Sequence, residues 1–414
     1  GPHAFHIKKG DVLPIVESFF NGDLLRKRTN VRTLARGKYL KYPFELYNIL
    51  TRLNPFLVLR MLFDFLMASV IYKFIHVPDD TFESWGIKRF GKTLYNFCFG
   101  KYTEKVWGMP ARLISPKFAS KKIKAIDLKS IISKILGGKG EEHEVYWDEF
   151  YYPEKGSGEL YTRMAAEFAR HGGQLHLNSK VNGLNCAPNQ VTSVAFEKEG
   201  KARDLESDFV ISTLPIRNLV LMMNPPPGDF IAYTAKRLKY RALVLVYLFL
   251  ATERVSDAHW TYLLDHRFKF NRVTEQKNSS VKTCPDGKTV VCFEICCNTT
   301  DEMWRYNAEQ FKQMALEEIR YMDGVDPGAI IDCHVEKLDE AYAVCHLNYD
   351  QQLKDLLQFL SGYRNLISTG RQGLFLQNDM HDSMAMGLAA AEFFTRGRED
   401  KLEWYQEKTA FLDW

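Results

Sequence analysis

The order of the elements expected between Val145 and Pro215 limits the fold more than any other feature of the sequence. The predicted elements are, in chain order, a strand at 145–153, a helix that ends near Arg170, and strands at 174–181, 191–196, 202–206 and 208–215. A strand, helix and strand with a hairpin inserted before the last strand is typical of an α/β unit around a partly parallel sheet. The sequence therefore predicts an α/β protein.

The segments on either side of this run have different patterns. Residues 44–136 are mostly helical in pattern, whereas residues 238–298 are rich in the β-branched and aromatic residues that favour an antiparallel sheet. A helix is expected over 308–322, and the chain continues with a strand at 365–370, a loop, and an alanine-rich helix over 379–394. These patterns interleave along the chain, so the lobes are expected to be discontinuous.

Charge and cysteine content restrict the class of protein. A net charge of +4 over 414 residues argues against nucleic-acid binding, which needs a larger and clustered basic surplus. Eight cysteines without CxxC spacing are too few for a disulfide scaffold. We interpret Cys292, Cys296 and Cys297 as part of a buried strand in a reducing compartment. A metal site is the alternative, but no histidine or second cysteine pair lies nearby in the sequence.

The longest apolar stretch runs from Phe56 to Ile75. It contains Arg60, Asp64 and Lys73, which argue against a helix that spans a membrane. The favoured interpretation is a helix packed over a substrate lobe. The alternative is an amphipathic anchor that lies on a membrane surface.

The strand, glycine loop and helix over 365–394 form the most informative local feature. Gly370 and Gly373 allow a ligand to approach the backbone closely. The helix that follows presents unpaired N–H groups and the positive end of its dipole, where an anion or an electron-rich ring oxygen is stabilised. An ordinary turn from a strand to a helix is the alternative.

Two groups of histidines and acids have simpler explanations beside the functional ones. His3 and His6 could bind a metal, but a loop that faces a ligand, or a solvated end of the chain, explains them better. His381 with Asp379 and Asp382 resembles a catalytic cluster, yet the beginning of a helix ordinarily collects such capping residues.

Six motifs occur in one order along the chain: GPHAFH (1–6), YTEKVWG (102–108), FYYPEKGSGEL (150–160), VISTLP (210–215), NRVTEQKN (271–278) and GRQGLFLQNDMHDSMAMG (370–387). Together they resemble the FAD-dependent superfamily of amine oxidases, protoporphyrinogen oxidases and UDP-galactopyranose mutases. The similarity is greatest to the prokaryotic oxidase-like branch, and it extends over nearly the whole chain.

This resemblance implies a Rossmann-like FAD-binding lobe of the GR2 type, interleaved with a mixed-sheet substrate lobe and a helical cap. The FAD-binding lobe is expected to comprise residues 1–37, 150–237 and 362–414. Residues 38–149 are expected to form the helical cap, and residues 238–361 the antiparallel substrate lobe. The sequence differs from the family in one respect, because it contains no GxGxxG. We therefore expect the chain to be a fragment or a shortened member that lacks the first βαβ unit.

The resemblance also implies roles for individual residues. It implies flavin contacts at Gly370, Arg371, Asp379 and Met380, with His3 facing the isoalloxazine ring, Val181 near adenine and Thr213 near the diphosphate. It implies substrate contacts at Tyr102, Trp107, Arg272 and Tyr342, with His3 and Arg272 as the catalytic candidates.

The predicted function is that of an FAD-dependent oxidoreductase that acts on a small molecule in the cytoplasm. The first alternative is a sugar-nucleotide mutase that uses reduced flavin and clamps a diphosphate with arginines, one of them Arg272. The sequence departs from the mutase pattern at three places. Residues 118–127 offer lysines where a mobile-loop arginine is expected, Gln377 replaces a tyrosine, and the segment AYAVCHLNY (341–349) lacks the expected proline. The second alternative is a flavin-free remnant that only binds a ligand.

Overall fold

The computed structural model describes residues 3–6, 12–42, 44, 46–75, 78–117 and 149–412. The lysine-rich segment 118–127 and the start of the strand expected at 145–153 lie outside these residues. The chain divides into two compact units. Unit 1 comprises Gly1–Lys8, Phe20–Glu159 and Arg241–Ala341, and unit 2 comprises Lys9–Phe19, Leu160–Tyr240 and Tyr342–Trp414. The expected helical cap and the expected antiparallel lobe both contribute to unit 1.

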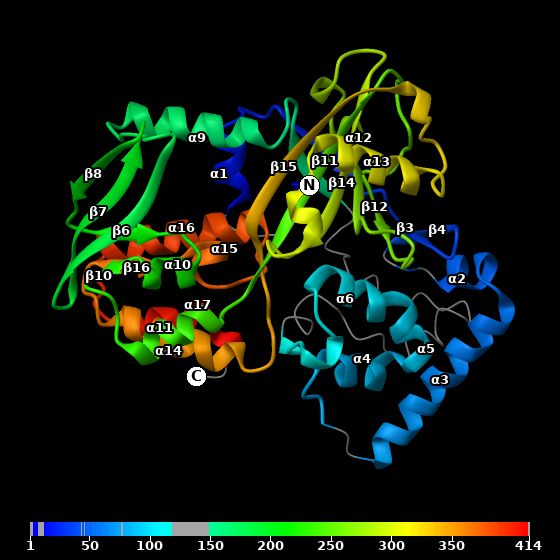
Figure 1. The fold of residues 1–414 in the computed structure, drawn as a ribbon, viewed down its shortest axis with the longest axis horizontal. Helices are drawn as coiled ribbons and strands as arrows, with labels where there is room; N and C mark the ends of the chain where they lie inside the picture. The colour runs from blue at the N-terminus through cyan, green and yellow to red at the C-terminus, as the bar shows by residue number, and fades with distance from the viewer. Residues whose placement is uncertain are drawn as a thin grey trace. The chain divides into compact units, whose positions relative to one another are not determined.

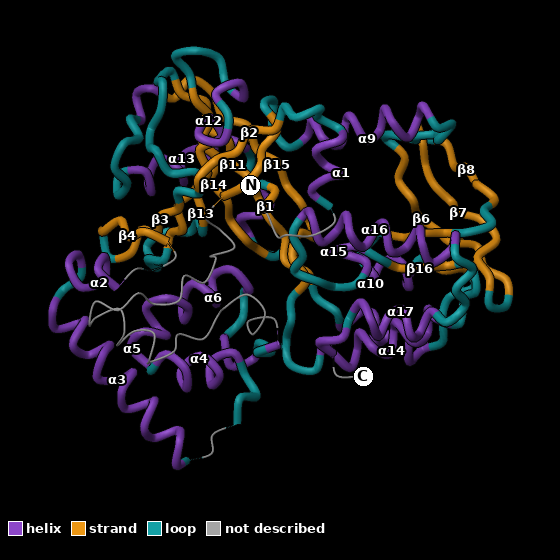
Figure 2. The backbone as a smooth tube through the Cα atoms, turned by 180° about the vertical axis from the view of Figure 1, so that it is seen from behind, coloured by secondary structure: helices purple, strands orange, loops and turns teal. Residues whose placement is uncertain are grey.

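Unit 1 contains a seven-stranded sheet and a three-stranded sheet (Figures 1 and 2). The larger sheet has the order β15 (Ile330–Ala343), β11 (Tyr240–Leu250), β14 (Thr289–Cys297), β13 (Arg272–Glu275), β12 (Trp260–Leu263), β3 (Val31–Ala35) and β4 (Lys38–Tyr42). The smaller sheet has the order β1 (Phe5–His6), β5 (Glu149–Pro153) and β2 (Leu24–Arg28). β11 and β14 are antiparallel, as the sequence predicted, whereas β12 and β3 are parallel.

The core of the large sheet follows from alternation along β11. Val244, Val246 and Leu248 are fully buried and pack with Phe293 of β14. Phe311 joins this core from α13 (Ala308–Ile319), the helix expected over 308–322. The three clustered cysteines lie buried on β14, which confirms the interpretation as a buried strand.

The helical part of unit 1 comprises α2 (Leu46–Arg52), α3 (Pro55–Phe74), α4 (Phe82–Phe90), α5 (Lys92–Tyr95) and α6 (Lys101–Trp107), with a short α12 (Gln276–Ser279) elsewhere in the unit. Asn54 caps α3 by accepting from Phe56 N, and Thr81 forms a capping box with Ser84 at the start of α4. Aromatic side chains around the buried Phe82 form the core between α4 and α5.

Unit 2 contains two further sheets. The four-stranded sheet has the order β10 (Met223–Asn224), β6 (Ser179–Ala187), β7 (Gln190–Lys198) and β8 (Lys201–Glu206), and the two-stranded sheet pairs β16 (Leu366–Ser368) with β9 (Val210–Ser212). β7 and β8 form the predicted antiparallel hairpin. The buried Asn365 amide joins the two sheets, because it donates to Val191 O at 2.7 Å and to Asp208 O at 3.0 Å.

The helices of unit 2 are α1 (Leu13–Ser18), α9 (Gly158–Arg170), α10 (Ile216–Leu221), α11 (Asp229–Arg237), α14 (Tyr349–Ser361), α15 (Gly370–Gly373), α16 (Met380–Thr395) and α17 (Lys401–Lys408). α9 ends at the residue expected from the sequence, where His171-Gly172-Gly173 follows. The helix expected over 379–394 is α16, with Asp379 as its N-cap.

Three elements differ from the sequence-based expectation. Residues 174–178 are not a strand, because the left-handed Asn178 (φ 53°) delays the start of β6 to Ser179. Residues 370–373, expected to be a loop, form the single turn α15. Finally, the parallel pairing of β3 with β12 was not expected from the sequence, and the apolar residues of β3 are buried.

Candidate functional site

The turn after β16 is built at the ends of two short parallel strands, β9 and β16. Thr369 N donates to Ser212 O at 2.8 Å, which extends the pairing to the last residue before the turn. Gly370 follows with φ 76°, a conformation that favours glycine. A Cβ built on Gly370 would lie 3.7 Å from Thr213 Cγ2. The structure therefore brings two predicted site residues, Gly370 and Thr213, together.

Gly373 is required for packing within the turn. A Cβ at this position would lie 2.9 Å from Ser368 Oγ and 3.1 Å from Ser212 O, which is closer than normal contact. Ser368 Oγ also donates to Gly373 O at 2.7 Å, so the turn is fastened back onto the strand that leads into it. The second glycine thus serves the turn itself, and the ligand argument depends on its neighbours.

Thr369 was not selected from the sequence, yet it carries the most informative atom of the turn. Its side chain is 1% exposed, and within the part of the chain that the structure describes its Oγ1 has no hydrogen-bond partner. A buried hydroxyl without a partner is unfavourable by about 1–3 kcal/mol. An unsatisfied hydroxyl next to Gly370 is the feature expected where a ligand completes the site.

Arg371 closes the other side of the turn. Its guanidinium donates to Asn378 O and, at 3.1 Å, to Gln377 Oε1. The guanidinium carbon also lies 5.4 Å from the centre of the Tyr342 ring. Gln377 Nε2 donates to Ala343 O at 2.7 Å, so the segment that carries Tyr342 is tied to the turn. Arg371 and Tyr342, two further predicted residues, are therefore neighbours.

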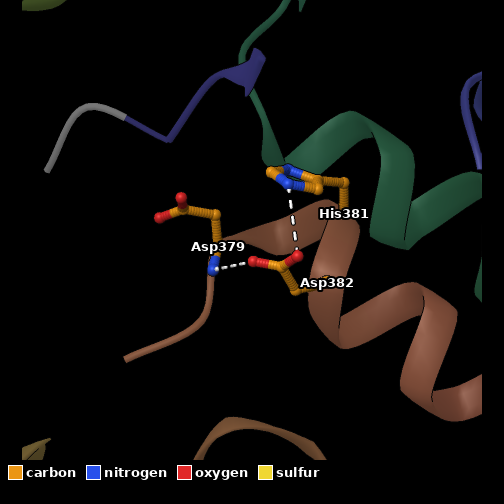
Figure 3. Close-up of side chains that lie close together, drawn as sticks. All are labelled: Asp379, His381 and Asp382. Atoms are coloured by element: carbon orange, nitrogen blue, oxygen red, sulfur yellow. Dashed lines mark hydrogen bonds and ion pairs between the residues drawn. The ribbon is translucent and has the colours of Figure 1, made fainter. Parts of the chain in front are cut away.

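The beginning of α16 holds the acidic and histidine cluster (Figure 3). Asp379 N donates to Asp382 Oδ2 at 3.1 Å, and His381 Nε2 lies 3.4 Å from Asp382 Oδ1. One possible ligand atom from each of the three residues lies within 4.8 Å of the others. Capping of the helix accounts for this arrangement. Met380 is the first residue of α16 and is half-buried.

Val181 lies apart from this turn along the chain. It is the third residue of β6, paired with Phe196, and a bulge separates it from Gly183. The sequence placed Val181 at the end of a strand, but the strand begins only at Ser179 and continues beyond it. Its predicted role near adenine stays a prediction.

The two predicted catalytic residues, Arg272 and His3, both lie in unit 1, where Arg272 forms an ion pair with Glu294. Arg272 Nε and Nη2 donate to the Glu294 carboxylate at 2.9 and 2.6 Å. The Glu294 side chain is fully buried, whereas that of Arg272 is 19% exposed. Burial alone would raise the pKa of Glu294, but the positive charge of Arg272 and the hydrogen bonds that it donates hold this pKa below its ordinary value.

Tyr102 and Trp107 lie on α6 in the same unit, and both are half-buried. The Tyr102 ring packs edge-on against Tyr262 of β12, with ring centres 6.1 Å apart. Lys105, between them, donates to three backbone carbonyls, those of Leu263, Phe268 and Phe270, at 2.6–3.2 Å. Burial lowers the pKa of Lys105 to about 8.

Thr369, Lys105 and Glu294 are the important residues that sequence reasoning missed. The available signal for Glu294 was a lone acid inside the otherwise apolar run TVVCFEICC. A charge at such a position is almost always paired, and the nearby Arg272 was the available partner. No signal in the sequence distinguishes Thr369 from any other threonine at the end of a strand.

Comparison with solved structures identifies the fold. The chain matches reduced UDP-galactopyranose mutase with a TM-score of 0.79 at 18% identity, covering 99% of this chain and 86% of that one. It matches a structure named as a protoporphyrinogen oxidase from an Exiguobacterium species with a TM-score of 0.69 at 14% identity, covering 95% and 87%. A double variant of putrescine oxidase gives 0.60 at 13% identity, covering 95% and 88%.

These matches define the fold as that of the flavoprotein oxidase and mutase group. Residues 106–380 also match the family of flavin containing amine oxidoreductases. The chain belongs to this family, and the resemblance found in the sequence is confirmed. The match includes Trp107, Val181, Thr213 and most of the turn after β16, and it ends at Met380.

Proposed function

We propose that this chain is a flavin-dependent oxidoreductase that binds FAD with the turn after β16 and acts on a small molecule. Membership of the flavin containing amine oxidoreductase family supports the flavin. The observation that carries the assignment to this turn is the buried Thr369 hydroxyl, which has no partner among the described residues, beside the left-handed Gly370. The group that completes the hydrogen bonding of Thr369 would lie against the backbone of Gly370, which is itself buried.

The residues of the turn fit a flavin by their chemistry. A bound FAD would supply the electron-accepting ring, and the protein would bind it, orient it and exclude water. The N-terminus of α16 would stabilise negative charge on the ring through its N–H groups and its dipole. Arg371, held between Gln377 and Asn378, would contribute a fixed positive charge on the same side.

A sugar-nucleotide mutase shares the fold, but the geometry favours the oxidoreductase. A mutase must clamp a diphosphate with arginines. Arg272, the candidate clamp, already commits two nitrogens to Glu294. Gln377, at the position of an expected tyrosine, is held between Arg371 and Ala343 O. Turnover that consumes an electron acceptor would support the oxidoreductase, whereas turnover without net electron flow would support the mutase.

The experiment that tests the site is a titration of the full chain with FAD, followed by flavin fluorescence, for the wild type and for Thr369→Val. Removing a hydroxyl that has no protein partner should leave stability unchanged or slightly higher. FAD affinity should fall about three- to tenfold, which is the effect of one hydrogen bond.

Thr409→Val is the matched control, because the buried Thr409 hydroxyl donates to Tyr405 O at 2.6 Å. This variant should lose about 1 kcal/mol of stability and bind FAD as the wild type does. Equal FAD affinity of Thr369→Val and the wild type would contradict the proposed site. A wild-type chain that binds no FAD would contradict the function as well.

A further inference from the structure

One face of α3 is apolar and exposed. Seven residues on this face are 42–85% exposed and recur every three or four positions, with Leu66 and Met67 adjacent: Phe56, Leu59, Phe63, Leu66, Met67, Val70 and Phe74. This spacing places them on one side of the helix. From Phe56 to Phe74 the strip is about 27 Å long at the rise of an α-helix. We define these seven residues as the α3 face.

The opposite side of α3 is held by the rest of unit 1. Val58, Met61 and Phe65 are buried there. Asp64 accepts from Thr93 N at 3.1 Å and also from the Thr93 hydroxyl. A Cβ on Gly91 would lie 2.6 Å from the Asp64 backbone, so only glycine allows this close approach. Figures 1 and 2 both show α4 and α5 along one flank of α3.

A surface helix of a water-soluble domain normally has a polar outer side. α3 is apolar on both sides, and Pro55–Tyr72 is long and apolar enough to cross a membrane by length and composition. However, α3 is fastened to α4 and α5 near its middle, so it cannot cross a bilayer without them. An orientation along the membrane surface satisfies both observations.

The charge of the chain segment that contains α3 indicates which kind of surface α3 meets. Residues 36–75 contain six basic residues (Arg36, Lys38, Lys41, Arg52, Arg60, Lys73) and two acidic ones (Glu45, Asp64), a net charge of +4. Of the basic residues, Arg36, Lys38, Lys41, Arg52 and Arg60 are exposed. Of the two acidic residues, Asp64 accepts a hydrogen bond from Thr93 N. A basic segment beside an apolar strip is the pattern that favours anionic lipid headgroups.

We propose that the α3 face binds the surface of an anionic lipid bilayer, with the apolar strip in the acyl boundary and the neighbouring basic side chains at the headgroups. The α3 face makes unit 1 a peripheral membrane domain. This proposal does not depend on the proposed function, because it uses no residue of the flavin turn and is measured without flavin.

The test is co-sedimentation of the full chain with vesicles of phosphatidylcholine that contain about 30 mol% phosphatidylglycerol, compared with phosphatidylcholine alone. The wild type should bind the anionic vesicles and lose most of its binding on neutral vesicles or at high salt. Phe63→Gln should lower the partition coefficient at least about tenfold. Phe63 is 61% exposed, so its replacement should leave the melting temperature unchanged.

Phe230→Gln is the matched control, because Phe230 on α11 in unit 2 is 66% exposed. It should bind vesicles as the wild type does. Equal binding by Phe63→Gln and the wild type, or binding by neither, would overturn the proposal. A wild-type dimer that Phe63→Gln converts to a monomer, without vesicle binding, would show that a second copy covers the α3 face. Equal binding to neutral vesicles would overturn the anionic part of the proposal.

Discussion

The Arg272–Glu294 pair offers a quantitative prediction, because the two partners differ in burial. The Glu294 carboxylate is fully buried, whereas the Arg272 side chain is 19% exposed. Removing one partner of a buried pair costs about 3–5 kcal/mol, because the other charge is left without compensation. Arg272→Met leaves a buried carboxylate without a positive partner and should lower the free energy of unfolding by about 4 kcal/mol at pH 7. Glu294→Gln leaves a guanidinium that water partly reaches and should lower the free energy of unfolding by about 3 kcal/mol.

The dependence on pH has opposite signs in the wild type and in Arg272→Met. In the wild type the pKa of Glu294 is lowered, so its contribution to stability is present above the unfolded value and is lost as the pH falls. In Arg272→Met, burial is no longer opposed by Arg272, and the pKa of Glu294 should rise. This variant should therefore recover stability as the pH falls from 7 towards about 4.5.

Urea denaturation of the wild type, both single variants and Arg272→Met/Glu294→Gln measures these values. The double variant should be about 2 kcal/mol more stable than the sum of the single effects predicts, because it contains no buried unpaired charge. Additive effects, or single effects below about 0.5 kcal/mol, would refute the reasoning that the pair is a coupled buried unit.

Two further predictions concern Glu318 and Gly370. Burial raises the pKa of Glu318 to about 7, so the wild type should lose up to about 3 kcal/mol of unfolding free energy as the pH rises from about 4.5 to 7. In urea titrations, Glu318→Gln should remove this dependence of the unfolding free energy on pH. An unchanged dependence would show that another group causes it. Gly370→Ala should cost about 1–2 kcal/mol from its left-handed backbone and weaken FAD binding. The control Gly200→Ala, with φ 72° in open space, should show the same cost with unchanged affinity; equal FAD loss in both would contradict the site.

Much of the fold followed from local pattern. The hairpin β7–β8, the strand β14 with its buried cysteines and the helix α16 were all predicted, because each combines a clear periodicity with turn or capping residues. The parallel pairing of β3 with β12 was not predicted. It joins segments more than 200 residues apart, and no local pattern contains that information.

The sequence predicted which residues belong to the candidate site, but it did not predict which of them contact one another. Gly370, Thr213, Arg371 and Tyr342 were named from the motifs, and unit 2 places them together in two neighbouring pairs. The role of Thr369 could not be predicted, because an unsatisfied hydroxyl is defined by what surrounds it in space. Likewise, the sequence favoured a helix packed over a substrate lobe for residues 56–75, but it could not show which face of α3 would be exposed.

The most direct test of the central claim is amide hydrogen exchange of the full chain with and without FAD, read on peptides that cover residues 366–385. The proposed site predicts slower exchange on FAD binding at Gly370 and Arg371 and in the first turn of α16. Unchanged exchange in these peptides, with protection elsewhere in unit 2, would show that FAD binds at a different place and would contradict the account.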